Sequence, residues 1–402
     1  MSNILSVPIT DKLTYIGVND RTTQLFENMW PLENGVSYNS YLITDEKTAL
    51  LDTVKVNRMD VFLEKLDEAL EGRNLDYLVI QHMEPDHSGA IETVMELYPN
   101  VKLVGNKKTR EFLKNYYDIE EESFIEVVEG DKLELGETNL TFYMTPMVHW
   151  PESMVSFDEK NGILYSQDIF GSFGALGGPI FDDEINWDLY LPETIRYYTN
   201  IVGKYSKQVQ IAMKKLGALD IKMVCAVHGP IWRDNPGRII DLYAKLANYE
   251  TEEGVVVVYG SMYGNTEKMA ETIARSLSAN GIKNIKLYDV SKTHLSYLLS
   301  DLWRYDGIVL GSCTYNNGVF PLMQNLLQTL LKQKMSNHTL AVFGSYGWGG
   351  GSVRDLMKFA EESKYDLVET TADAKGSATK EDLELCKQIG KEMADILKAK
   401  RA

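Results

Sequence analysis

The stretch VIQHMEPDHSGA, residues 79–90, places four side chains of the metal-binding type within six positions. The whole chain contains six histidines, and two of them, His82 and His87, lie here beside Glu84 and Asp86. We expect His82, Glu84 and Asp86 to share one face of an extended segment, with His87 on the opposite side. A polar loop after a strand is commonly only a solvated turn, but four ligand-type residues in one loop favour a metal site.

Three further residues of ligand type, His149, Asp168 and His228, each follow an apolar, strand-like segment. Because α/β sheets gather their sites at the carboxyl ends of strands, we expect these three to converge with the first four. Four imidazoles and three carboxylates are too many for one tetrahedral ion, and they suit two ions joined by a bridging carboxylate. With no thiolate among the donors, the candidate metals are iron, zinc and manganese, and the carboxylates favour the harder ions.

Composition limits the classes of protein to which the chain can belong. Its 402 residues are enough for two domains, and its formal net charge of −17 argues against nucleic acid, which binds clustered Lys and Arg. We find neither a signal-peptide pattern nor an apolar stretch of membrane-spanning length, so we expect no membrane partner. Cys225, Cys313 and Cys386 form no C-x-x-C pair, which indicates a reducing cytoplasm and no Cys₄ iron centre within the chain.

The sequence pattern changes near the polar run 249–254, where we expect the boundary between a domain 1–250 and a domain 254–402. The first domain mixes short strands with amphipathic helices, which is typical of a layered α/β or α+β domain. Its expected strands are 13–18, 40–43, 49–54, 75–81, 101–104, 140–144, 154–157, 162–166 and 221–227, and its expected helices include 58–70 and 192–215.

The second domain alternates strands and helices regularly, which predicts a doubly wound parallel sheet of the flavodoxin type. Its expected strands are 255–259, 285–289, 307–310, 339–343 and 366–370, and its expected helices include 265–280 and 380–398. Ligands of such sheets bind in the loops that follow the central strands.

Three of those loops suit flavin mononucleotide, FMN. Loop 261–266 opens a helix, so its backbone N–H groups and hydroxyls can hold a phosphate, although a Ser/Thr-rich helix cap would explain this loop taken alone. Loops 311–318 and 344–350 offer aromatic rings to the flavin, and Ser352 stands where a dinucleotide motif needs its third glycine, so we reject NAD. The residues predicted to bind FMN are Ser261, Met262, Tyr263, Gly264, Asn265, Thr266, Ser312, Thr314, Tyr315, Asn316, Asn317, Ser345, Tyr346, Gly347, Trp348 and Gly349.

The first domain resembles the metallo-β-lactamase fold in its loop after residues 75–81 and in the sequence ALLDT at 49–53. Hydrolases of that fold carry H-x-H-x-D-H in the loop, whereas this chain has Glu84 at the second position. The H-x-E-x-D-H pattern, followed by His149, Asp168 and His228, resembles the flavodiiron proteins (A-type flavoproteins) over essentially the whole chain. That resemblance implies a metallo-β-lactamase-like αββα sandwich followed by a flavodoxin-like domain.

The same resemblance implies two non-haem irons per chain. One iron would be held by His82, Glu84 and His149, the other by Asp86, His87 and His228, and Asp168 would bridge them. With FMN, such a protein would reduce O₂ to water, NO to N₂O, or both. The resemblance also implies rubredoxin as the external electron donor and a head-to-tail homodimer, which can pair further into a dimer of dimers.

Two other functions are compatible with parts of the sequence. A zinc hydrolase with an accessory flavodoxin module is the first, and a plain flavin electron carrier with a vestigial lactamase domain is the second, although no ligand position has been lost. We expect His294 and His338 to be solvated, and Cys313 to be a small packing residue beside the flavin loops. Trp150 and Phe170 are expected to wall the metal pocket.

Overall fold

The computed structural model of the chain describes residues 6–117, 119 and 123–401. It divides into two compact units, Met1–Ala244 and Lys245–Ala402. Each unit has its own hydrophobic core, as the sequence predicts for a chain of this length. None of the helices in the described part of the chain combines the length and the apolar character needed to cross a membrane.

The first unit contains two sheets that pack face to face. Leu51 and Val79 of one sheet share a core cluster with Leu140 and Phe142 of the other. The seven-stranded sheet has the order β1 (Val7–Pro8), β2 (Leu13–Tyr15), β7 (Tyr41–Thr44), β8 (Thr48–Leu51), β9 (Tyr77–Val79), β10 (Lys102–Gly105) and β11 (Phe124–Glu126). The five-stranded sheet has the order β12 (Lys132–Glu134), β13 (Asn139–Met144), β14 (Met154–Asp158), β15 (Ile163–Gln167) and β16 (Met223–Ala226). Two small ribbons pair β3 (Val18–Asp20) with β6 (Val36–Tyr38) and β4 (Leu25–Phe26) with β5 (Trp30–Pro31).

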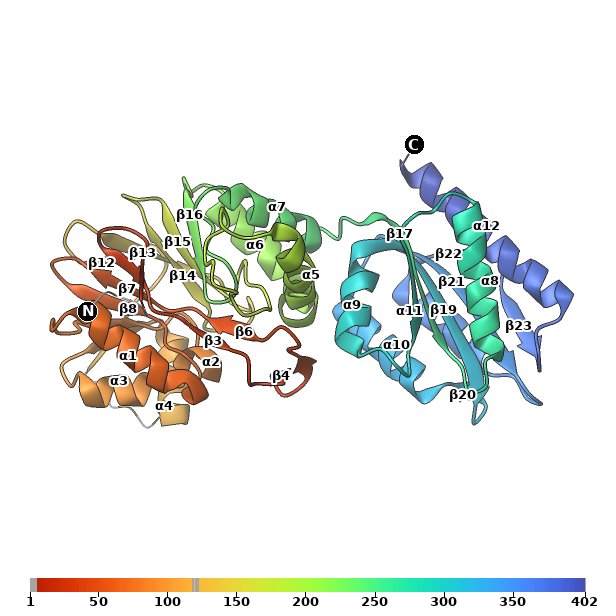
Figure 1. Cartoon of the computed structure of the whole chain (residues 1–402), viewed down its shortest axis with the longest axis horizontal. Helices are drawn as coiled ribbons and strands as arrows, with labels where there is room; N and C mark the ends of the chain where they lie inside the picture. The colour runs from red at the N-terminus through yellow and green to blue at the C-terminus, as the bar shows by residue number, and fades with distance from the viewer. Residues whose placement is uncertain (1–5, 118, 120–122, 402) are drawn as a thin grey trace. The chain divides into compact units, whose positions relative to one another are not determined.

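Helices cover the outer faces of this pair of sheets, which makes the αββα sandwich that was predicted (Figure 1). The helices are α1 (Met59–Leu70), α2 (Pro85–Ser88), α3 (Ile91–Leu97), α4 (Lys107–Tyr117), α5 (Trp187–Tyr197), α6 (Ser206–Leu216) and α7 (Pro236–Ala247). Figure 1 places α1, α3 and α4 on the side of the seven-stranded sheet and α5 to α7 alongside the five-stranded sheet.

Two local expectations in the first unit are wrong. Asp86 and His87 lie on the one-turn helix α2, which Pro85 begins, and so they do not continue an extended segment. The helix expected at 192–215 starts earlier, because the side chain of Asn186 caps α5 by accepting a hydrogen bond from the Asp188 N–H. That helical stretch is also interrupted between α5 and α6 by a π-helical turn and a 3₁₀ turn, at residues 198–202 and 203–205.

The second unit is built on a sheet whose long strands all run parallel. Its order is β18 (Ile285–Asp289), β17 (Glu252–Gly260), β19 (Tyr305–Tyr315), β21 (Thr339–Tyr346) and β22 (Asp366–Leu367), with β23 (Ala372–Lys375) also on β21 and the short β20 (Gly318–Val319) on β19. One face carries α8 (Asn265–Ala279) and α12 (Lys380–Arg401), and the other carries α9 (Leu295–Arg304), α10 (Pro321–Gln333) and α11 (Ser352–Ser363) (Figure 1). This is the doubly wound, flavodoxin-like order that was predicted.

The last strand of this sheet differs from the expected single segment 366–370. β22 pairs with the start of β21, and β23 pairs with its end. Between them, the N–H and hydroxyl of Thr370 donate hydrogen bonds of 3.0 and 2.7 Å to the carboxylate of Glu392 on α12. The Thr370 N–H, which would donate to a neighbouring strand if β22 and β23 were continuous, therefore donates to α12 instead.

The two histidines outside the predicted metal site have different environments. His294 is exposed, as expected, and its Nδ1 caps α9 by accepting a hydrogen bond from the Ser296 N–H. His338 is only 2% exposed, with its Nδ1 3.1 Å from the Tyr305 carbonyl oxygen and its ring against Tyr365. The expectation that His338 is solvated is therefore wrong, and burial lowers its pKa to about 4.

Candidate metal centre and flavin cavity

The seven predicted metal ligands lie just beyond the carboxyl ends of four strands. The loop after β9 carries His82 and Glu84 and leads into α2 with Asp86 and His87. His149, Asp168 and His228 follow β13, β15 and β16, which run in the same direction within the five-stranded sheet and so end at the same edge. All seven residues are buried, with 0 to 7% of their surface exposed.

Buried polar residues hold the loop after β9 in place. Asp52 accepts hydrogen bonds from the backbone N–H groups of Gln81 and His82, at 2.8 and 3.3 Å. Thr53 donates its N–H and its hydroxyl to the carbonyl oxygen of His87, both at 2.8 Å. Because Asp52 and Thr53 directly follow the neighbouring strand β8, the sheet fixes the positions of the residues that hold this loop.

The ligand atoms form two groups, and within each group they lie within 4.8 Å of one another. In the first group, Glu84 Oε2 lies 3.4 Å from His82 Nε2 and 3.0 Å from His149 Nε2. Two atoms about 2.1 Å from one ion are about 3.0 Å apart at a right angle and about 3.4 Å apart at the tetrahedral angle. The observed distances are therefore those of donors around a single ion.

The second group has the same geometry. The Nε2 atoms of His87 and His228 are 3.0 Å apart, and each lies 3.4 Å from Asp86 Oδ2. Asp168 faces both groups: its Oδ2 lies 3.0 Å from His82 Nε2, and its Oδ1 lies 3.5 Å from His228 Nε2. One carboxylate thus presents one oxygen to each group, which is the arrangement of a bridging ligand.

Several buried atoms of this cluster have no hydrogen-bond partner among the described residues. They include both carboxylate oxygens of Asp86, and also His82 Nε2 and Asp168 Oδ2, which face each other without hydrogen-bond geometry. Leaving buried polar atoms unpaired costs about 1–3 kcal/mol each, and coordination of a cation removes that cost. The residues present therefore fit a pair of metal ions.

The electrostatics of the cluster agree with that fit. Burial lowers the pKa of His87, but the charges of Asp86 and Asp168 outweigh burial and raise that pKa to about 9. Burial raises the pKa of Glu84, yet its contacts with His149 and His82 hold that pKa well below its ordinary value. The carboxylates therefore favour protonated imidazoles when no metal is bound, and metal uptake would release those protons.

Three contacts behind the ligands escaped the sequence analysis. Glu152 Oε1 lies 2.8 Å from His82 Nδ1, the Ser37 carbonyl oxygen lies 2.7 Å from His228 Nδ1, and the Tyr197 hydroxyl donates to Asp168 Oδ1 at 2.8 Å. Such contacts fix the orientation and the tautomer of ligands. Of these three residues, only Glu152 lies close in the sequence to a predicted ligand, His149. Ser37 and Tyr197 are distant in the sequence from the ligands that they contact, and only the fold brings them to the site.

Most of the predicted flavin-binding residues line one cavity of about 470 Å³ at the carboxyl ends of β17, β19 and β21. Cys313 and Gly376 line it as well, and burial raises the pKa of the Cys313 thiol, in keeping with a packing role. Gly264 and Ser312 are the two predicted residues that do not line it. Ser312 is fully buried, and its hydroxyl accepts a hydrogen bond from the Phe320 N–H.

The cavity fits FMN in both volume and chemistry. Gly264, with a φ of 88°, precedes α8, and no side chain caps the helix, so its first N–H groups are available to a phosphate. The hydroxyls of Thr266 and Ser345 meet at 2.9 Å beside that end of the helix. Tyr263 and Trp348 are 91% and 94% exposed at the cavity, where their rings can pack against a flavin.

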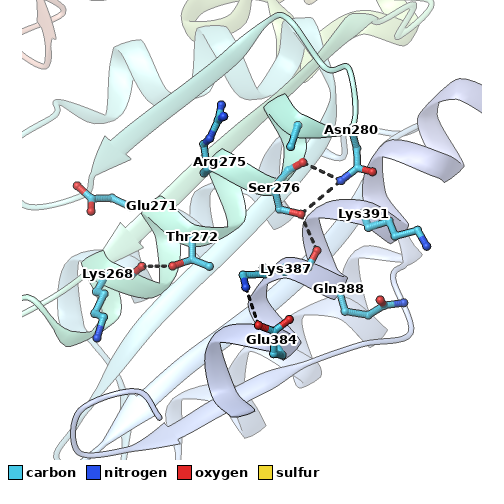
Figure 2. Close-up of a pocket in the computed structure, with 11 residues that line it drawn as sticks. Lys268, Glu271, Thr272, Arg275, Ser276, Asn280, Glu384, Lys387, Gln388 and Lys391 are labelled. Atoms are coloured by element: carbon cyan, nitrogen blue, oxygen red, sulfur yellow. Dashed lines mark hydrogen bonds and ion pairs between the residues drawn. The ribbon is translucent and has the colours of Figure 1, made fainter. Parts of the chain in front are cut away.

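A larger hollow, of about 690 Å³, lies between α8 and α12, apart from both predicted sites (Figure 2). Its polar groups largely satisfy one another: Lys387 pairs with Glu384, Ser276 donates to the Lys387 carbonyl oxygen, and Asn280 donates to the Ser276 carbonyl oxygen. Volume alone therefore does not mark the functional site of this chain.

The fold and the two sites define a class of protein in which a metallo-β-lactamase-like metal domain and a flavodoxin domain share one chain. Residues 36–229 match the family described as ODP family beta lactamase, and residues 257–390 match the flavodoxin family. A nitric oxide reductase of Moorella thermoacetica is 32% identical, over 96% of this chain and 98% of that protein.

Solved structures agree with these matches. The rubredoxin oxygen:oxidoreductase of Desulfovibrio gigas is 32% identical, with a TM-score of 0.94 over 99% of this chain and 100% of that one. The flavodiiron protein of Giardia intestinalis is 25% identical, with a TM-score of 0.93 over 98% of this chain and 97% of that one. This chain belongs to the flavodiiron proteins.

Proposed function

We propose that this chain reduces O₂ to water, NO to N₂O, or both, at two iron ions that receive electrons through FMN. The observation that carries this proposal is the pair of donor groups that Asp168 faces with one oxygen each, in a chain that also holds a flavin cavity. The first iron would be held by His82, Glu84 and His149, the second by Asp86, His87 and His228, and Asp168 would bridge them. The functional domains would run from 1 to 250 and from 254 to 402.

Reduced FMN and a diferrous pair together supply four electrons, the number that O₂ needs to become water, and NO reduction to N₂O uses two electrons per pair of NO molecules. The protein's own residues bury the site and set its charge. Once metal is bound, each donor group would combine two imidazoles with one carboxylate, and the bridge would add one more negative charge to the pair. Asp168 also accepts the Tyr197 hydroxyl hydrogen, which holds the bridge in one orientation.

We further propose that FMN is held by the predicted residues that line the cavity, with the phosphate at the start of α8 and the flavin ring among Tyr263, Tyr315 and Trp348. This placement rests on the uncapped helix and on the exposure of the three rings.

The electron donor would be a separate redox protein. The name of the Desulfovibrio gigas relative supports rubredoxin in that role. We propose that the functional form is a head-to-tail homodimer in which the flavin of one subunit reduces the iron pair of the other. We place the protein in the cytoplasm, where free thiols stay reduced.

Metal analysis of the purified protein tests the proposal. We expect two irons per chain, and we expect His82→Ala, His149→Ala and His228→Ala to lower the iron content and abolish gas reduction. A protein that binds zinc in place of iron and hydrolyses an ester or amide would support the zinc hydrolase instead.

A further inference from the structure

The two donor groups are matched in their direct ligands. Each contains two imidazoles and one carboxylate of its own, and each faces one oxygen of Asp168. Any inequality between two irons bound there must therefore come largely from the groups behind the ligands.

Behind the first group stands a buried carboxylate. Glu152 Oε1 lies 2.8 Å from His82 Nδ1 and also accepts the Met83 N–H at 2.8 Å, and both Glu152 and His82 are 0% exposed. Because the Met83 amide and the imidazole share one acceptor, the hydrogen on His82 lies on Nδ1. The Nε2 atom is then free to bind a metal.

Behind the second group, no imidazole donates a hydrogen bond to a carboxylate among the described residues, and the charge of buried Asp52 acts on His87 and His82 alike. His228 Nδ1 donates to the Ser37 carbonyl oxygen at 2.7 Å, and His87 Nδ1 has no hydrogen-bond partner among the described residues. The bridging carboxylate is also a weaker electron donor towards the second group. The Tyr197 hydroxyl donates a hydrogen bond to Asp168 Oδ1, the oxygen that faces this group. That hydrogen bond withdraws more electron density from the second group than from the first.

An imidazole that donates its N–H to a carboxylate is a stronger electron donor than one that donates to a neutral carbonyl. A stronger donor, with a fixed negative charge behind it, stabilises Fe³⁺ more than Fe²⁺, because the interaction grows with the charge of the ion. A buried site strengthens the effect, since little water screens it.

We propose that Glu152 makes the two irons unequal, so that the iron of His82, Glu84 and His149 has the lower reduction potential. The iron of Asp86, His87 and His228 then takes up the first electron, and the iron beside Glu152 takes up the second. Glu152 acts as a positioning residue through His82 and does not touch the iron. The inference rests on the proposed di-iron function.

A potentiometric titration of the iron- and FMN-loaded protein tests this inference, followed by the electron paramagnetic resonance signal of the mixed-valence Fe²⁺Fe³⁺ pair. Each step adds one electron from the titrant, so the signal appears at the higher potential and vanishes at the lower one. In Glu152→Gln, which keeps the hydrogen-bond acceptor and removes the charge, we expect the lower potential to rise and the higher one to stay. The maximum of the mixed-valence signal should fall several-fold.

Two further variants separate charge from structure. Glu152→Asp keeps the negative charge and should restore the wild-type separation at least in part. Asp158→Asn removes another buried carboxylate, whose side-chain hydrogen bonds go to the turn at residues 160 and 161, and should leave the separation unchanged.

The inference is overturned by a rise in the higher potential alone, by an equal rise in both, or by no change. It is also overturned if Glu152→Gln and Glu152→Asp fold but bind no iron. A wild-type protein without two irons would instead refute the proposed function, so the two failures are distinguishable.

Discussion

Asp168 is the residue that joins the two halves of the candidate site. It is fully buried, and its two oxygens face different donor groups at 3.0 and 3.5 Å. A carboxylate can serve two cations at once with its two equivalent oxygens, whereas an amide offers only one oxygen of ligand quality. The site therefore depends on the charge and symmetry of this one side chain.

Asp168→Asn should lower the iron content below two per chain and abolish gas reduction, with a larger effect than loss of any single histidine. Metal analysis and gas consumption measure both. Asp158→Asn is the matched control, because Asp158 is equally buried but bonds only to the turn at residues 160 and 161. Full activity with two bound irons in Asp168→Asn would refute the bridging role.

His338 gives the molecule a dependence on pH that is independent of the metals. Its folded pKa of about 4 lies below the ordinary value of 6.5, because burial outweighs the opposing charge of Asp306. Below pH 6.5 the unfolded chain binds a proton that the folded chain does not, so stability is complete above that pH and falls as the pH drops towards 4. From these two pKa values we expect a loss of about 2 kcal/mol between pH 7 and pH 5.

Urea unfolding of the wild type and of His338→Gln, followed at both pH values, measures this loss. The variant should lose less stability than the wild type over the same interval. An equal loss in both proteins would show that another group is responsible.

Sequence reasoning can predict the ligand candidates at the residue scale because each follows an apolar strand. It cannot predict Ser37 or Tyr197, which come from a short ribbon and a helix with no spacing relation to the ligands. The burial of His338 also escapes it, because its neighbours Asn337 and Thr339 read as polar while the packing comes from Tyr305 and Tyr365.

At the scale of elements, the order of strands follows from the sequence but their ends do not. The long apolar runs predict the strands β17, β19 and β21, and their alternation with helices predicts that the sheet is parallel. The split between β22 and β23 depends on Glu392, which lies on α12 and captures Thr370. The one-turn helix α2 similarly depends on Pro85, whose fixed φ angle favours a helix start over an extended segment.

The packing of α8 on α12 depends on a glycine. A Cβ atom on Gly390 would lie 2.6 Å from Ser276 Cβ and 2.8 Å from the Ile273 carbonyl oxygen, so the helices could not keep their present separation. Gly390→Ala should therefore destabilise the flavodoxin-like domain by about 1–3 kcal/mol, although alanine favours a helix over glycine by about 1 kcal/mol.

Urea unfolding of the FMN-loaded protein measures this change. Lys391→Ala is the control, because the neighbouring Lys391 is exposed at the edge of the hollow in Figure 2 and its loss should change stability little. A Gly390→Ala protein more stable than the wild type would contradict the close approach of the two helices.

At the scale of the whole molecule, the proposed head-to-tail dimer makes a prediction about mixed assemblies. One inactive variant would lack iron ligands, as in His82→Ala with His228→Ala, and the other would repel the FMN phosphate, as in Thr266→Asp. Thr266 is buried beside the uncapped start of α8, where a negative charge competes with the phosphate.

The two variants should regain partial activity when they are co-assembled, because one heterodimer site then combines an intact flavin with an intact iron pair. Each homodimer alone is the control and should stay inactive. If each chain reduces its own irons, the mixture should remain as inactive as its parts.

The most direct test of the central claim is a single turnover of the iron- and FMN-loaded protein. The protein is reduced anaerobically with four electrons per chain and mixed rapidly with O₂ or, separately, with NO. We predict that one O₂ per chain is consumed to water without release of H₂O₂, or that NO is converted to N₂O at two electrons per N₂O, with FMN and iron both reoxidised. Reoxidation of the flavin alone, with H₂O₂ released from O₂, no N₂O formed from NO, and the same rates in Asp168→Asn, would contradict the account.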